Sequence, residues 1–113
     1  MTNYESVPNL CEELEIPVTG HLGRTLQNDE PAKIILFSFA AGDGLAGHSA
    51  PMPAIIQILR GQAVLTLGTD TREAAAGYWV SMPPQLNHAI VAKTPVTMLL
   101  TLLKLPDSTA RNG

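Results

Sequence analysis

The stretch GDGLAGHSAPMPAIIQILRGQAVLTL, residues 42–67, carries most of the information about the fold. Residues 54–60 form a run rich in isoleucine and leucine, which predicts a β-strand. Gly61 and Gln62 then predict a turn, and residues 63–67 predict a second strand that pairs back on the first as a hairpin. Residues 42–44 are rich in glycine and end the apolar run that precedes them.

Short apolar runs on both sides of this stretch predict further strands, at 33–41, 78–81, 88–91 and 96–105, with 72–76 as strand or loop. Nine glycines and nine prolines separate most of these runs. A parallel α/β fold is disfavoured, because no run is followed by an amphipathic helix of about 10–15 residues. The pattern therefore predicts an all-β domain, either a sandwich or a closed barrel.

The N-terminal part of the chain is the least regular. Asn9 is a candidate N-cap for one helical turn over residues 9–14, which Pro17 would end. We expect a single domain over residues 1–113. It would consist of an irregular N-terminal arm, a core and a polar tail, over residues 1–31, about 32–105 and 106–113.

The composition excludes several classes of protein. The chain has 113 residues, 45% hydrophobic and 15% charged, and a formal net charge of −3, so most of it is not disordered. Its seven Lys and Arg are scattered, which disfavours a nucleic-acid partner. No run approaches the roughly 20 apolar residues of a membrane helix, and the first residues lack a signal-peptide pattern. Cys11 is the single cysteine, so we expect a soluble cytoplasmic protein without disulfides.

Two stretches match the spacing of a pair of known sequence motifs, each built around glycine and histidine. The first motif reads glycine, five residues, His-x-His, three or four residues, glutamate, six residues, glycine. Gly42, His48 and Gly61 match this spacing, but Ala50 stands at the position of the second histidine and Ala54 at that of the glutamate.

The second motif reads glycine, five residues, Pro-x-Gly, two residues, histidine, three residues, asparagine. Gly77, Pro83 and His88 match it, whereas Gln85 replaces the second glycine and Ala92 the asparagine. These two motifs are those of the RmlC-like cupin superfamily, which the chain resembles over residues 34 to about 104. The resemblance implies a double-stranded β-helix, or jelly-roll, cupin barrel.

The resemblance also implies a candidate metal site. Metal-binding cupins hold their metal with three histidines and one glutamate, and here His48 and His88 occupy two of these positions. Ala50 and Ala54 occupy the other two, and two imidazoles alone hold a first-row metal weakly. We therefore expect one divalent transition metal (Zn, Fe, Ni, Mn or Cu) that is weakly bound or absent. Alternatively, both histidines are simply hydrogen-bonded inside the barrel.

Alternation along the chain predicts the walls of a cavity. Counting every second residue from His48 gives one strand face. With a methionine of the last strand, this face would line a largely apolar cavity, formed by Ala50, Met52, Ala54, Ile56 and Met98. The thioether of Met52 suits Cu(I) better than Zn or Fe. Plain core filling is the alternative role for these methionines.

The opposite strand face predicts a partner. Ile55, Gln57 and Leu59 should point away from the barrel interior, and apolar residues on both faces mean that both faces are covered. In small cupins this outer face packs against a second subunit, so the pattern and the resemblance together predict a homodimer. Trp79 would then lie in the subunit interface or close one end of the barrel.

Three functions stay open at this level. The first is a small-molecule-binding barrel with a degenerate site at His48 and His88, and the second is a metal-dependent cupin enzyme, dioxygenase- or isomerase-like. In the enzyme, water or substrate would complete the metal shell. The third is a partner domain without chemistry in its cavity. The two alanines, and the lack of an inward-facing glutamate, favour the first.

Overall fold

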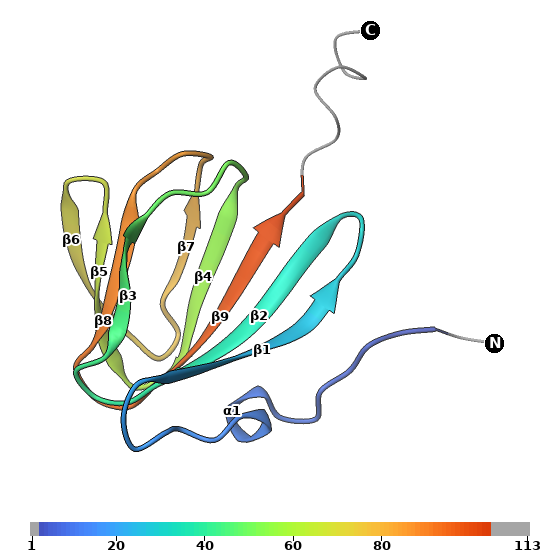
Figure 1. The fold of residues 1–113 in the computed structure, drawn as a ribbon, viewed down its shortest axis with the longest axis horizontal. Coiled ribbons are helices and arrows are strands. Elements are labelled where there is room, and N and C mark those ends of the chain that lie inside the picture. Colours follow the sequence, from blue (N-terminus) through green and yellow to red (C-terminus); the bar gives the residue numbers. More distant parts are fainter. Residues whose placement is uncertain (1–2, 105–113) are drawn as a thin grey trace, which may run out of the picture.

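The computed structural model describes residues 3–104, which form two antiparallel sheets and one short helix (Figure 1). The elements, in chain order, are α1 (Leu10–Glu13), β1 (His21–Asn28), β2 (Ala32–Phe39), β3 (Gly44–His48), β4 (Ala54–Arg60), β5 (Gln62–Leu67), β6 (Asp70–Ala75), β7 (Trp79–Met82), β8 (His88–Ala92) and β9 (Val96–Leu103). One sheet has the order β1-β2-β9-β4-β7 and the other β3-β8-β5-β6. This arrangement confirms the predicted all-β barrel class.

Most of the predicted strands are present. The apolar runs at 33–41, 54–60, 63–67, 78–81, 88–91 and 96–105 correspond to β2, β4, β5, β7, β8 and β9. Residues 72–76, predicted as strand or loop, largely belong to β6. The predicted end of the last strand at Leu105 and the predicted polar tail at 106–113 lie outside the described residues.

The irregular N-terminal arm is shorter than predicted, because residues 21–28 form strand β1. This strand pairs antiparallel with β2, from His21 opposite Phe39 to Asn28 opposite Lys33. It lies at the edge of the sheet and most of its side chains are exposed, so it shows no apolar alternation. An edge strand of this kind carries little signal in the sequence, which is why the prediction missed it.

The predicted hairpin of residues 54–60 and 63–67 is wrong, because the two strands lie in different sheets. β4 pairs with β7 and β9, whereas β5 pairs with β6 and β8. Gly61 forms the corner between them with φ +89°, and a Cβ there would overlap the carbonyl oxygen of Pro95. A glycine marks a change of direction in the sequence, but long-range packing decides which strand pairs with which.

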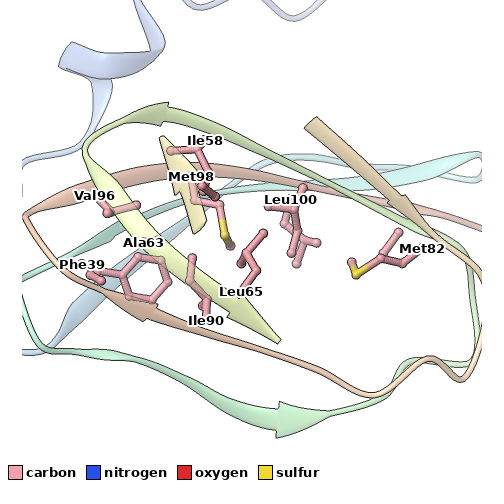
Figure 2. Close-up of a cluster of buried hydrophobic side chains, with 13 residues drawn as sticks. Phe39, Ile58, Ala63, Leu65, Met82, Ile90, Val96, Met98 and Leu100 are labelled. Atoms are coloured by element: carbon pink, nitrogen blue, oxygen red, sulfur yellow. The ribbon is translucent and has the colours of Figure 1, made fainter. Parts of the chain in front are cut away.

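The core lies between the two sheets (Figure 2). Along β4 the buried residues Ala54, Ile56 and Ile58 alternate with less buried neighbours, as expected for a strand with one face in the core. The largest side chains of this core come from both sheets: Phe39, Ile58, Leu65, Met82, Ile90, Val96, Met98 and Leu100.

The N-terminal segment covers part of the outer face of the five-stranded sheet. Leu36 in β2 is fully buried but is not part of the core between the sheets, whereas its neighbours Ile35 and Phe37 pack against that core. Leu36 therefore points to the outer face of the sheet. Ser38 Oγ donates a hydrogen bond of 2.6 Å to the carbonyl oxygen of Glu15. Arg60 Nη2 donates another, of 2.9 Å, to the carbonyl oxygen of Cys11. These contacts tie residues 11–15 across β2 and β4.

The short helix begins where the sequence predicted it. The side chain of Asn9 accepts a hydrogen bond from the backbone N–H of Cys11, and helix α1 ends after a single turn. Among residues 3–104, no helix has the length and the apolar character needed to cross a membrane.

Candidate functional site

The two histidines at the motif positions lie opposite each other on neighbouring strands. His48 is the last residue of β3 and His88 the first of β8, and they are direct partners in the register of the two strands. Their ring centroids are 4.4 Å apart, and the ring planes are inclined by 56°. Strand pairing alone therefore brings together two imidazoles from separate motifs, since directly opposite side chains project to the same face of a sheet.

Both rings are held by the same kind of hydrogen bond. Nδ1 of His48 lies 3.0 Å from the carbonyl oxygen of Ala46, and Nδ1 of His88 lies 3.0 Å from that of Leu86. A carbonyl oxygen only accepts, so each Nδ1 carries a proton and donates it. Each ring, when neutral, then presents Nε2 with a free lone pair. A backbone carbonyl orients metal-binding histidines in the same way.

A small apolar cavity adjoins this ring pair. Its walls are formed by Leu45, His48, Ile56, His88, Ala89, Ile90, Met98 and Leu100. The cavity volume is about 20 Å³, enough for roughly one water molecule. His88 is only 7% exposed, whereas His48 is exposed. His48 therefore lies on the solvent side of the pair and His88 on the interior side.

Two of the five predicted cavity residues line this cavity, namely Ile56 and Met98. Ala54 is buried in the core and pairs with Met82, but it is not part of the cavity wall. Ala50 and Met52 are half-buried in the loop between β3 and β4. The alternation counted from His48 breaks in this loop, because its two prolines cannot donate the hydrogen bonds of a central strand.

Four further wall residues were not predicted: Leu45, Ala89, Ile90 and Leu100. Ile90 follows His88 by two positions, and Leu100 follows Met98 by two, so each pair shares one strand face. The same alternation, counted from His88 and Met98, could have found both.

The loops on either side of the site are joined by a backbone hydrogen bond. The N–H of Gln85 donates to the carbonyl oxygen of Ala50 over 2.7 Å. Gln85 has φ +71°, and it is the only non-glycine residue with positive φ among residues 3–104. It stands where the second motif has glycine, and this backbone conformation is the physical reason for a glycine there.

The donor set does not fit the metal centre implied by the motifs. Within residues 3–104, no three His, Cys, Asp or Glu side chains are grouped so that they could hold a metal ion. Methyl groups stand at the two remaining ligand positions, Ala50 and Ala54. The two imidazoles are thus half of the expected ligand set.

The third histidine lies elsewhere. Nδ1 of His21 is 2.7 Å from the carboxylate of Asp43, and both side chains are partly exposed. The backbone of Asp43 accepts a hydrogen bond from Ala92, at the end of β8 that is opposite to His88. His21 is therefore at the other end of the barrel from the ring pair.

Solved structures resemble this chain over most of its length. A conserved protein of unknown function from Streptococcus pyogenes matches with a TM-score of 0.84 and 31% identity, over 94% of this chain and 93% of that chain. A cupin superfamily protein from Desulfitobacterium hafniense matches with a TM-score of 0.81 and 24% identity, over 93% and 95%. An RmlC-like cupin from Desulfovibrio desulfuricans matches with 0.79 and 24%, over 88% and 97%. At this level of identity, the last two show a shared fold.

More distant matches include an enzyme. Salicylate 1,2-dioxygenase from Pseudoaminobacter salicylatoxidans is similar with a TM-score of 0.70 and 16% identity, over 76% of this chain and 28% of that chain. No protein-family model matches the chain, and no curated protein does. The similar structures thus include both an enzyme and proteins of unknown function, and the likeness by itself does not choose between them.

Proposed function

The chain shares the fold of RmlC-like cupin proteins, and on that premise we propose that its barrel binds a small molecule at the ring pair of His48 and His88. One observation carries the proposal. Both rings donate from Nδ1 to a backbone carbonyl, so both neutral imidazoles offer Nε2 beside an apolar cavity. An apolar wall with a few convergent polar groups is the usual composition of a small-molecule site.

The size and charge of the cavity restrict the ligand. A volume of about 20 Å³ admits a group of one or two heavy atoms, so only a head group enters the barrel. The rest of the ligand would lie at the mouth, against the loops of residues 49–53 and 83–87. Among the described residues, the cavity wall carries no Asp, Glu, Lys or Arg. A neutral head group with a polar hydrogen matches two imidazole acceptors in such a wall.

Ligand-observed and protein-observed NMR with small neutral alcohols, phenols and amides tests this proposal. A binding compound is expected to shift the ring signals of His48 and His88 while those of His21 stay in place. The His48→Ala, His88→Ala double variant should lose the binding, and His21→Ala should keep it. Compounds that bind the double variant as well as the wild type would refute the proposal.

A metal-dependent enzyme is the second candidate, and the fixed tautomers favour it, since an unprotonated Nε2 is also a metal ligand. Water or substrate would have to supply the ligands that Ala50 and Ala54 lack. Elemental analysis of protein purified without an affinity tag decides between the candidates. Near-stoichiometric divalent metal that is lost in the double variant would favour an enzyme, and its absence after incubation with Fe, Zn, Ni, Mn or Cu would favour the binding protein.

We also propose that the chain forms a homodimer through the outer face of the five-stranded sheet. The N-terminal segment covers only part of this face, and Trp79 on the edge strand β7 is 57% exposed. Its neighbour across the strands, Gln57, is half-buried, as are Ile55 and Leu59. Light scattering after size exclusion should give a dimer mass for the wild type and a monomer mass for Trp79→Asp. A monomeric wild type would refute the dimer.

A further inference from the structure

We propose that a groove on the outer face of the five-stranded sheet binds a small amphipathic amine, which has an apolar chain and a protonated amino group. This outer groove lies outside the barrel and does not depend on His48 or His88. The N-terminal segment forms one of its walls, and strands β1, β2 and β9 form the other. Figure 1 shows this segment outside the sheet, on the side of β1.

The apolar compartment of the outer groove has a volume of about 280 Å³. Five half-buried apolar side chains line it, and none of them belongs to the core between the sheets: Val7, Leu10, Leu26, Ile34 and Leu99. The volume is close to the lower end of the roughly 300–1,000 Å³ that is typical of small-molecule sites. A chain of several carbon atoms therefore fits here, whereas the cavity of about 20 Å³ beside the histidine rings is too small for it.

A β-bulge in β1 joins this compartment to a polar one. The register of β1 against β2 shifts between Thr25 and Gln27, and the consecutive residues Leu26 and Gln27 both line the groove. A bulge can redirect side chains in this way. Gln27 and Glu5 also line a second hollow, of about 390 Å³, together with Asn3, Tyr4 and Asp29. Because the two hollows share two wall residues, they form an apolar and a polar compartment of one groove.

The charge of the polar compartment selects the ligand. Its walls include the exposed carboxylates of Glu5 and Asp29, and the described walls of both compartments contain no Lys or Arg. None of the ion pairs within residues 3–104 involves either carboxylate. The ammonium group of Lys104 instead donates a hydrogen bond of 2.6 Å to the side chain of Asn28.

An aromatic ring adds to the attraction for a cation. Tyr4 lines the polar compartment and is 76% exposed, and the face of an aromatic ring attracts a positive charge. An apolar hollow beside two carboxylates and this ring is complementary in charge and polarity to an alkylammonium ion. Such an ion stays protonated at neutral pH, as the lysine side chain does.

Titration of the full chain with hexylamine at pH 7 and low ionic strength, followed by protein NMR, tests the inference. The control ligands 1-hexanol and hexanoate have the same chain length with a neutral or a negative head group. Hexylamine should shift the methyl signals of Val7, Leu26 and Ile34 and leave the ring signals of His48 and His88 in place. It should bind about two- to fivefold more tightly than 1-hexanol, as expected for an exposed ion pair. Hexanoate should bind most weakly, and about 1 M NaCl should remove most of these differences.

A matched pair of glutamate variants isolates the charge. Glu5→Gln should weaken hexylamine binding by about two- to fivefold and leave the affinity for 1-hexanol unchanged. Glu12→Gln removes an exposed carboxylate of the same segment that lines neither compartment, so both affinities should equal those of the wild type. Leu26→Trp fills the apolar compartment and should weaken the binding of hexylamine and 1-hexanol alike.

Equal affinity for the three ligands, unchanged hexylamine affinity in Glu5→Gln, or shifts confined to the barrel would each overturn the inference. A dimeric wild type that becomes monomeric in Leu26→Trp would also overturn it, because a second copy of the chain would then occupy the groove. The His48→Ala, His88→Ala double variant should still bind hexylamine at the outer groove. Failure of the proposed function and failure of this inference are therefore distinguishable.

Discussion

Replacing Gly61 by alanine should destabilise the protein much more than the same replacement at Gly77. Both glycines have strongly positive φ, +89° and +98°, so alanine meets a similar backbone strain at each. At Gly77 no atom lies within 4 Å of the added Cβ. At Gly61 the added Cβ would lie 3.0 Å from both the carbonyl carbon of Pro95 and Oγ1 of Thr94, and closer still to the Pro95 oxygen.

The contacts around Gly61 give the size of the effect. A left-handed backbone conformation destabilises a non-glycine residue by about 1–2 kcal/mol. Alanine also lowers the entropy of the unfolded chain, which stabilises the folded protein by about 0.4–1 kcal/mol. Gly77→Ala should therefore cost about 1 kcal/mol. At Gly61 the 94–95 backbone must also move, although Thr94 and Lys93 hold Gln62 through three hydrogen bonds. Each such bond contributes about 0.5–1.5 kcal/mol, so Gly61→Ala should cost about 3 kcal/mol.

Urea denaturation at one fixed protein concentration measures both variants, because a dimer would make stability depend on concentration. For a chain of this size, the difference of about 2 kcal/mol corresponds to roughly 8 °C in Tm. Equal losses of stability at the two positions would refute the idea that close approach to Pro95 requires glycine at this corner.

Three further predictions concern stability and use the same assay. Gln85→Gly should raise the free energy of unfolding by about 0.5 kcal/mol, because glycine relieves the strain of φ +71° but loses more entropy on folding; Gln85→Ala, which keeps the strain, should not. Thr97→Val should raise the free energy of unfolding by about 1 kcal/mol, since Thr97 Oγ1 is fully buried without a hydrogen-bond partner among the described residues. A lower free energy of unfolding would contradict this and would show that the hydroxyl has a hydrogen-bond partner. Leu36→Ala should cost about 2–5 kcal/mol and expose residues 11–15 to proteolysis, because Leu36 packs beneath the N-terminal segment; Leu22→Ala, at a partly exposed position, should cost much less.

The predicted fold class was confirmed because its signal is local and repeated. Short apolar runs, most of them bounded by glycine or proline, mark β2, β4, β5, β7, β8 and β9. β1 was missed because it lies at a sheet edge with few buried side chains. The hairpin of β4 and β5 was wrong because a Gly61 turn looks the same in sequence whether the chain folds back or crosses to the other sheet.

The candidate site was also predictable only in part, in its residues but not in its geometry. The spacing of the two motifs singled out His48 and His88, and alternation singled out Ile56 and Met98. The contact of the rings, 4.4 Å between centroids, depends on the pairing of β3 with β8. The proton on each Nδ1 depends on carbonyl groups two residues upstream, whose direction follows from the local backbone.

By itself, the sequence determined the all-β class, the place of most strands and the residues with ligand atoms, because side-chain chemistry and strand period are properties of neighbouring residues. Only the tertiary structure decided the order of the strands, the corner at Gly61, the burial of Thr97 and the convergence of His48, His88 and Met98 on one cavity. These features arise between segments far apart in the chain. Their energies come from the burial and hydrogen bonding of both partners at once, which neither segment specifies alone.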